Sequence, residues 1–218
     1  KKGIQIGTHI KQCGMAQDVL FENYNEDIEK VNDLLFPVLD EEAAKEMRAY
    51  MEAAANDGDS VGGILETAVV GVPSGVGEPW FDTLESMLAH GIFSIPAVKG
   101  IEFGKGFAFA EMKGSTANDS FVVENGEVAT KTNNNGGING GITNGMPVLF
   151  RCAVRPTPTI SMEQNTIDME KKEDAVLLSK GRHDPCIVHR ARIVVDCITA
   201  LTVADMLCTR YGTDWLAK

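Results

Sequence analysis

Residues 148–156 read Val-Leu-Phe-Arg-Cys-Ala-Val-Arg-Pro, an apolar run that leads directly into a cationic turn. Branched and aromatic residues in a short run are typical of a buried strand, so we expect a strand over 148–154. Arg155 and Pro156 then lie in the turn that follows. The pattern therefore predicts a positive charge at the end of a buried strand.

The segment just upstream is unusually rich in two residue types. Ten of the thirteen residues of 133–145, Asn-Asn-Asn-Gly-Gly-Ile-Asn-Gly-Gly-Ile-Thr-Asn-Gly, are Asn or Gly. Glycine lets a ligand approach the main chain closely, and asparagine tolerates left-handed turns. The run is either main chain laid against a flat or phosphorylated ligand, or a flexible linker.

A second cationic turn follows at residues 181–186, Gly-Arg-His-Asp-Pro-Cys. Two such turns after a Gly/Asn loop favour the ligand interpretation and predict an anion-binding site built from loops. The cations concentrate late in the chain, at Arg151, Arg155, Lys180, Arg182, Arg190 and Arg192. The alternative is a set of solvated surface charges.

The overall charge limits the kind of ligand. Lys+Arg number 20 against 31 Asp+Glu, a net charge of −11, which disfavours nucleic acid because its binding requires neutralised phosphates. A small anion remains possible, since a local cluster can outweigh the global field. No apolar run reaches the roughly 18 residues of a membrane span, so we expect no membrane partner.

Length and cysteine content indicate a single reduced domain. The 218 residues, 44% of them hydrophobic, suffice for one large domain, and no linker divides residues 1–218. The five cysteines form no Cys-x-x-Cys pair, so we expect no metal site and a reduced, cytoplasmic compartment, with Cys186 serving packing. Strand-like alternation begins within a few residues of Lys1, without a Met, so we expect that an N-terminal part is missing.

Hydrophobic periodicity predicts both helices and strands. Strands are predicted over 3–12, 61–72 and 99–103, with a hairpin over 120–130 that turns at Asn125-Gly126. Helices are predicted over 41–56, capped by Asp40, over 81–90, and over 187–211. The inward side chains of the last helix are expected to be Val194, Ile198, Leu201 and Met206. Hairpins mixed with separated helices indicate an α+β fold with antiparallel sheets.

Common nucleotide-binding and nucleophile motifs are absent. Residues 100–106, Gly-Ile-Glu-Phe-Gly-Lys-Gly, have neither the spacing nor the hydroxyl of a P-loop. No Gly-x-Gly-x-x-Gly connects a strand to a helix, and no Gly-x-Ser-x-Gly occurs.

Four histidines and one aspartate are candidates for proton chemistry. We expect His9 and His90 to be structural, as lone histidines usually are, whereas His183 and His189 flank Asp184. Asp184 has two interpretations. It caps the following helix, or it is a carboxylate held beside Arg182 that accepts or relays a proton.

Seven blocks resemble the chorismate synthase family, in the family's order and over nearly the whole chain. They are Asp59-Ser-Val-Gly-Gly63, Gly75-Val-Gly-Glu-Pro-Trp-Phe-Asp82, Ser94-Ile-Pro-Ala-Val-Lys-Gly100, Gly114-Ser-Thr-Ala-Asn-Asp119, Gly136-Gly-Ile-Asn-Gly-Gly-Ile142, Arg155-Pro-Thr-Pro-Thr-Ile160 and Arg182-His-Asp-Pro-Cys186. Each block alone is a weak signal, but seven in order are specific.

The resemblance implies a fold and an activity. The family's fold is a β-α-β sandwich of antiparallel sheets with helices packed between them, and its members are homotetramers. They eliminate phosphate from 5-enolpyruvylshikimate 3-phosphate in an anti-1,4 sense, giving chorismate in the shikimate pathway of aromatic amino acid biosynthesis. They require reduced FMN although no net oxidation occurs, and NADPH is a possible reductant.

The resemblance also implies site residues. Flavin contacts map to Thr116 and Ala117, to Gly140, to the run Arg155, Pro156, Thr157, Pro158 and Thr159, and to Arg182. Asp184 corresponds to an acid near the flavin and is implied in proton handling. Threonine hydroxyls and arginines in these turns would meet the flavin phosphate or the departing one, and reduced flavin supplies electron density that side chains lack.

The chain departs from the family pattern in its histidines. The family's catalytic histidines lie in Gly-Glu-Ser-His-Gly and Arg-Pro-Gly-His-like motifs that this sequence does not contain, so no role is transferred to His9, His90, His183 or His189. Arg155 stands where the family usually has Lys. We therefore expect the C-terminal two thirds of such an enzyme, inactive alone. The alternatives are a non-catalytic flavin-binding or assembly module and a plain redox flavoprotein.

Overall fold

A five-stranded antiparallel sheet forms the centre of the computed structural model, which describes residues 2–124 and 126–216. The strand order is β2-β1-β3-β9-β4, and each neighbouring pair is antiparallel. The strands are β1 (Gln5–Cys13), β2 (Ala16–Gln17), β3 (Gly63–Val70), β4 (Val98–Phe103) and β9 (Val148–Val154). The strand predicted over 148–154 is thus confirmed, and it lies inside the sheet.

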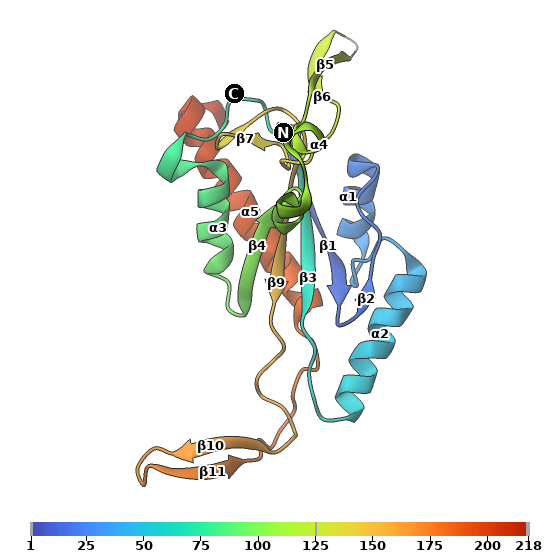
Figure 1. Cartoon of the computed structure of the whole chain (residues 1–218), viewed down its shortest axis with the longest axis vertical. Helices are drawn as coiled ribbons and strands as arrows, with labels where there is room; N and C mark the ends of the chain where they lie inside the picture. Colours follow the sequence, from blue (N-terminus) through green and yellow to red (C-terminus); the bar gives the residue numbers. More distant parts are fainter. Residues whose placement is uncertain (1, 125, 217–218) are drawn as a thin grey trace.

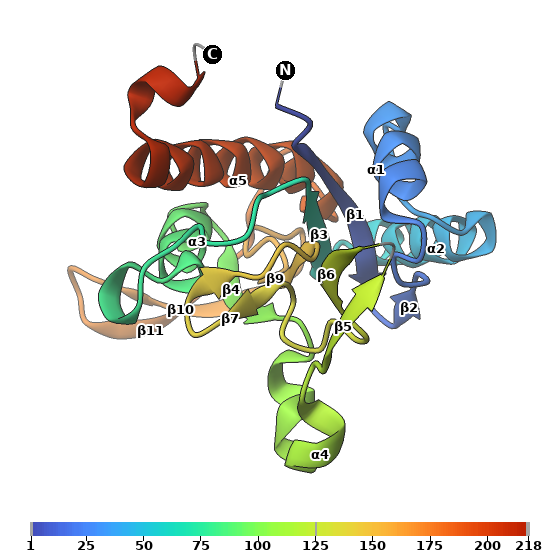
Figure 2. The ribbon, with the colours of Figure 1, turned by 90° about the horizontal axis from the view of Figure 1, so that it is seen from above.

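Helices flank both faces of this sheet (Figures 1 and 2). The longer ones are α1 (Tyr24–Asp33), α2 (Glu41–Asn56), α3 (Leu84–Phe93) and α5 (Val188–Tyr211), and α4 (Gly114–Ala117) is a single turn. Helix α5 packs against β1 and α3, while α1 packs against β1 on the other side. Helix α2 lies beside β1 and β2.

Three two-stranded ribbons accompany the central sheet. They are β5 (Phe121–Glu124) with β6 (Glu127–Thr130), β7 (Ile138–Asn139) with β8 (Ile142–Thr143), and β10 (Gln164–Asp168) with β11 (Glu173–Leu177). The hairpin predicted over 120–130 is confirmed in β5 and β6, whose register pairs Glu124 with Glu127. Its predicted turn residue Asn125 lies outside the described residues.

Strand β9 divides its side chains between two hydrophobic cores. Val148, Phe150, Cys152 and Val154 are buried, and they belong to the larger core, which includes residues of α3 and α5. On the opposite face, Leu149 packs against the smaller core around Ile28 and Val31 of α1. Because successive side chains of a strand point to opposite faces of the sheet, β9 contributes residues to both hydrophobic cores.

The predicted helix start is correct for α2 and a few residues too early for α3. Asp40 Oδ2 accepts a hydrogen bond from the amide of Ala43 at 3.0 Å, which confirms the predicted cap. The next helix begins at Leu84 rather than at 81, because Thr83 is its cap and Phe81 lies in a preceding 3₁₀ turn (η1, Trp80–Asp82).

The inward face predicted for the last helix is partly wrong. Val194 is 43% and Leu201 68% exposed, whereas Val195, Thr199 and Val203 are buried. Of the predicted set, Met206 is buried and Ile198 is partly buried against the core. The error arises because α5 is apolar on more than one face, so spacing alone does not fix its orientation.

The α+β class with antiparallel strands is confirmed. Of the two large sheets that a β-α-β sandwich contains, the described residues form one. Helices α3 and α5 lie together on one of its faces (Figure 2), as a helical layer of such a sandwich would.

Candidate functional site

The two cationic turns meet on one short segment that leads into β3. The first turn, 155–159, leaves the end of β9, and the second, 182–184, leads into α5. Ser60 Oγ donates to the carbonyl of Thr157 at 2.6 Å. The neighbouring amide of Val61 donates to the carbonyl of Pro185 at 2.7 Å. The fold therefore brings these two predicted parts of the site together.

The β10–β11 hairpin connects the same two turns in the sequence. Its first strand begins five residues after Thr159 and its second ends five residues before Arg182. In Figure 1 the hairpin projects from the lower end of the molecule, and its two stems run back toward the sheet. The turns are thus the bases of one projecting arm.

Two guanidinium groups and one hydroxyl in these turns are available to a ligand. Arg155 and Arg182 are exposed, and among the described residues neither has a carboxylate within 4.0 Å. Thr157 Oγ1 is buried and has no hydrogen-bond partner among the same residues. An unsatisfied buried hydroxyl costs free energy unless a partner arrives, so these groups suit a bound anion.

Asp184 pairs with Arg190 in the first turn of α5, not with Arg182. Helix α5 has no side-chain cap, so the capping interpretation is wrong. Both members of the pair are about half exposed, and such a pair adds little stability. The ion pair does fix the position of the Asp184 carboxylate in the second cationic turn.

Two histidines flank this carboxylate. His183 Nε2 lies 3.3 Å from the carbonyl of Ser179. Burial, followed by the charge of Arg190, lowers the pKa of His189 below its ordinary value. Both effects favour the neutral imidazole of His189.

The Asn/Gly loop packs against its own chain, so the flexible-linker interpretation is wrong. A Cβ on Gly136 would lie 2.5 Å from the carbonyl oxygen of Leu149, and one on Gly141 would lie 2.5 Å from Thr83 Cγ2. Gly140 differs, because its φ is +59° and nothing lies within 4 Å of its Cβ position. Most glycines here permit close packing of main chain, and Gly140 leaves main chain open to a ligand.

Thr116 and Ala117 lie in α4, where their carbonyls each accept a bond from Asn134 Nδ2 at 3.2 Å. The loop that contains Asn134 and Gly140 packs at the first residues of β9, whereas Arg155 follows the last. The two groups of predicted flavin contacts consequently lie at opposite ends of this strand (Figure 1). Within one chain the fold does not bring them together.

A row of charged side chains crosses the central sheet. The sequence patterns did not predict this row. His9, Glu66, Arg151 and Glu102 are register partners on β1, β3, β9 and β4. His9 Nε2 lies 3.0 Å from Glu66 Oε2, and Arg151 lies 3.5 Å from Glu66 and 3.3 Å from Glu102. Arg151 therefore serves the sheet, which corrects its assignment to the anion-binding cations.

Arg192, a second of the late cations, is also structural. It is buried on α5 and donates to the carbonyls of Thr8 and Val31. The sequence does contain a signal for the row across the sheet, because Glu66 and Arg151 are the only charged residues of two mostly apolar strands. A charge in such a strand requires a partner, which alternation does not identify.

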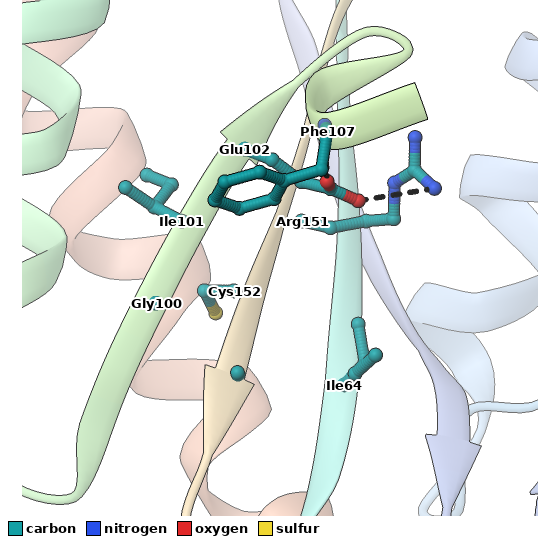
Figure 3. Close-up of a pocket in the computed structure, with 8 residues that line it drawn as sticks. Ile64, Gly100, Ile101, Glu102, Phe107, Arg151 and Cys152 are labelled. Carbon is teal, nitrogen blue, oxygen red and sulfur yellow. Dashed lines mark hydrogen bonds and ion pairs between the residues drawn. The ribbon is translucent and has the colours of Figure 1, made fainter. Parts of the chain in front are cut away.

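The exposed end of this row borders a cavity of about 210 Å³ (Figure 3). Phe107, Ile64 and the backbone of Gly100 provide its apolar wall, and Glu102 and Arg151 close one side. None of the predicted site residues lines it. The cavity is therefore separate from the two turns.

The fold is that of an α+β protein with an antiparallel sheet, and two cationic turns meet at the start of its strand β3. A sequence profile of chorismate synthase matches residues 1–208. The chain is 52% identical over 179 residues to the chorismate synthase of Thermococcus gammatolerans, and 46% identical over 207 residues to that of Methanosarcina mazei. These alignments cover 82% and 93% of this chain.

A crystal structure of a chorismate synthase superposes with a TM-score of 0.79 at 28% identity, covering 97% of this chain and 59% of that one. The chain belongs to the chorismate synthase family. It spans 50% and 55% of the length of the two relatives. Among the described residues, no helix is long and apolar enough to span a bilayer, and no metal-binding cluster occurs.

Proposed function

We propose that this chain provides the phosphate- and flavin-binding turns of a chorismate synthase, a carbon–oxygen lyase that eliminates phosphate from 5-enolpyruvylshikimate 3-phosphate. The observation that carries the proposal is the availability of Arg155, Arg182 and Thr157 Oγ1 around one segment. Unpaired cations and an unsatisfied hydroxyl fit an anionic ligand. Membership of the chorismate synthase family supports a phosphorylated substrate and reduced FMN as the ligands of these turns.

The reaction breaks a carbon–oxygen bond and leaves negative charge on the departing phosphate. Arg155 and Arg182 would neutralise that charge or the phosphate of the cofactor, and preorganised charges are effective because they need no rearrangement during the reaction. Asp184, held by Arg190, is a carboxylate that can accept a proton. Reduced FMN, when bound, supplies electron density to the substrate.

The distance between the two groups of predicted contacts favours a site shared by two copies of the chain. Gly140 leaves main chain open at one end of β9, and Arg155 is free at the other. A homo-oligomer, which we propose to be a tetramer, would let one copy's Gly140 and Thr116 face another copy's Arg155. The same proposal includes a cytoplasmic location and NADPH as reductant of the flavin.

Anaerobic titration with reduced FMN tests the binding turns directly. We expect Arg155→Ala and Arg182→Ala to weaken binding roughly 10- to 100-fold, the effect of losing a charged hydrogen bond. Lys171→Ala, on the exposed tip of the β10–β11 hairpin, is the matched control and should leave affinity unchanged. Equal affinities in all variants would remove the turns from the site.

Catalysis is tested by phosphate release from 5-enolpyruvylshikimate 3-phosphate. Two proteins are assayed: the chain alone, and a fusion of the N-terminal part of the Thermococcus gammatolerans relative to this chain, called the joined protein. Release by the joined protein that requires reduced FMN supports the proposal. Flavin binding without elimination in the joined protein would favour a non-catalytic flavin module, and NADPH oxidation without phosphate release would indicate a redox flavoprotein.

A further inference from the structure

Two buried cysteines from distant parts of the chain lie side by side. The Sγ atoms of Cys13 and Cys186 are 3.9 Å apart, although the residues are 173 positions apart in the sequence. Cys13 ends β1, and Cys186 lies just before α5. Their exposed fractions are 0% and 2%, so their mutual contact excludes bulk solvent.

Cys186 belongs to the segment that carries the second cationic turn. It follows Asp184 by two residues, and residues 178–187 between β11 and α5 contain no helix or strand. The hydrogen bond from Val61 to Pro185 and the exposed Asp184–Arg190 pair hold this segment. Cys186 itself is buried in the main core, so a small reagent would reach it through local opening of this segment, which lies outside the helices and strands.

We propose that Cys13 and Cys186 are an oxidation site, at which a peroxide forms a disulfide that ties β1 to the turn carrying Arg182 and Asp184. The peroxide oxidises one thiolate to a sulfenic acid and releases water or hydroxide. The second thiolate attacks that sulfur, the S–O bond breaks, and a second water leaves. One peroxide thus accepts two electrons, and two thiols become one disulfide and two waters.

The two thiols have different surroundings, and the difference bears on which of them the peroxide oxidises first. The contact with Cys13 lowers the pKa of Cys186 against the effect of burial, and a hydrogen bond from the Val188 amide lowers it further. The same contact raises the pKa of Cys13. Since the thiolate is the reactive form, this direction favours Cys186 as the thiol that the peroxide attacks, and Cys13, whose Sγ lies 3.9 Å away, as the second thiol.

Other cysteines provide internal comparisons. Burial raises the pKa of Cys152 to about 12, so this thiol is unreactive. Cys197 is exposed on α5 and has no other thiol beside it among the described residues, so it can be oxidised but has no resolving partner. The pairing of two thiols, rather than exposure, makes the first site distinct.

The disulfide has a mechanical consequence for the turn. A disulfide bond is roughly 2.0 Å long, so the sulfur atoms must approach by almost half of their present separation. Because Cys13 ends a strand of the central sheet, the adjustment falls mainly on the segment around Cys186. Oxidation therefore displaces and fixes residues 182–186, independently of whether the chain performs the proposed elimination.

The test is oxidation of the whole chain with one equivalent of hydrogen peroxide, followed by intact mass measurement and peptide mapping. We expect a loss of about 2 Da, since two hydrogens leave, a Cys13–Cys186 linked peptide that a reducing agent separates, and the loss of two of the five thiols. Amide hydrogen exchange of residues 179–187 should slow, and the melting temperature should rise by roughly 5 °C.

Variants separate the pair from the exposed thiol. Cys197→Ser should form the same disulfide, whereas Cys13→Ser and Cys186→Ser should not lose the 2 Da noted above. If a buried serine prevents folding, peptide mapping of the unmodified sequence still decides. Oxygen addition at Cys197 alone, dimers linked through Cys197, or a linked peptide with unchanged exchange of 179–187 would each overturn the proposal.

Discussion

The Nδ1 atom of His9 lies 2.7 Å from the Oδ2 atom of Asp18, and neither side chain is exposed. The other ring nitrogen faces Glu66. A buried histidine between two carboxylates makes the free energy of unfolding depend on pH. Burial by itself would lower the pKa of His9, but the hydrogen bonds to Asp18 and Glu66 outweigh it and raise the pKa above 6.5.

The first prediction follows from this pair. Because the folded pKa of His9 exceeds the unfolded value, its contribution to the free energy of unfolding is complete below pH 6.5 and is lost as pH rises through the raised pKa. Urea unfolding between pH 5 and 9 should show a decline of at most about 1.4 kcal/mol per pH unit. His9→Gln should lose roughly 3 kcal/mol and flatten this decline. His90→Gln, exposed on α3, is the control, and an unchanged slope in His9→Gln would contradict the assignment.

Asp18 determines how the free energy of unfolding changes at acidic pH. Burial opposes its ionisation, but hydrogen bonds from His9 and from the amides of Leu39 and Asp40 lower its pKa below 3.8. Its contribution is therefore present above that pH and is lost as pH falls through the lowered pKa. Asp18→Asn should weaken the acid dependence of the urea midpoint, and an identical acid limb in the variant would show that other carboxylates control it.

A second prediction concerns Arg192, which connects α5 to β1 and α1. Its Nε lies 3.0 Å from Asp196 Oδ2, and one Nη donates to the carbonyl of Val31 at 3.0 Å. Arg192→Ala should cost about 3–5 kcal/mol of unfolding free energy, because it leaves a partly buried carboxylate without its partner. Arg190→Ala on the same helix should cost under about 1 kcal/mol. Denaturant midpoints that fall equally in both variants would exclude the connecting role.

A third prediction distinguishes two adjacent glycines of the Asn/Gly loop. Both have positive φ, but a Cβ on Gly141 would lie 2.5 Å from Thr83 and 2.7 Å from the carbonyl oxygen of Glu78, whereas Gly140 is open. Gly140→Ala should cost about 1 kcal/mol from backbone strain alone. Gly141→Ala should cost more, roughly 3 kcal/mol, since rigid main chain must move. Thermal melting compares them, and equal losses would contradict the packing difference.

A fourth prediction uses the unsatisfied hydroxyl of Thr157. Thr157→Val removes a buried oxygen that has no partner, so stability should be unchanged or higher. If the oxygen serves a bound phosphate, affinity for reduced FMN should fall roughly tenfold. Thr166→Val, at an exposed position on β10 outside both turns, is the matched control. A variant that loses stability without losing affinity would show that the hydroxyl serves the fold.

Sequence patterns located the four longer strands of the central sheet, the β5–β6 hairpin and the capped helix α2, because their signals are local. Alternation identified β1, a short apolar run identified β9, and Asp40 with the two glutamates after it identified the start of α2. Helix α1 was not predicted, because it is mostly polar and contributes only Ile28 and Val31 to a core. Its stability comes from tertiary packing, which no local pattern contains.

The candidate site was predictable only in part for a related reason. Gly/Pro punctuation and charge marked the turns at Arg155 and Arg182, and segment 60–62 does join them. The role of Arg151 was not evident, because its partners Glu66 and Glu102 come from two other strands. Equally, the separation of Gly140 from Arg155 depends on the direction of β9, which sequence proximity conceals.

The projecting β10–β11 hairpin exposes the chain to proteolytic cleavage. Lys171 and Lys172 lie at its exposed tip, so a protease that cleaves after lysine could cut there without disturbing the central sheet. After such a cut, Arg155 and Arg182 would belong to different polypeptide fragments, held in place only by their hydrogen-bonded contacts with the strand entrance. The persistence of ligand binding in that nicked protein would measure how far the turns are organised by the body of the molecule rather than by the covalent arm between them.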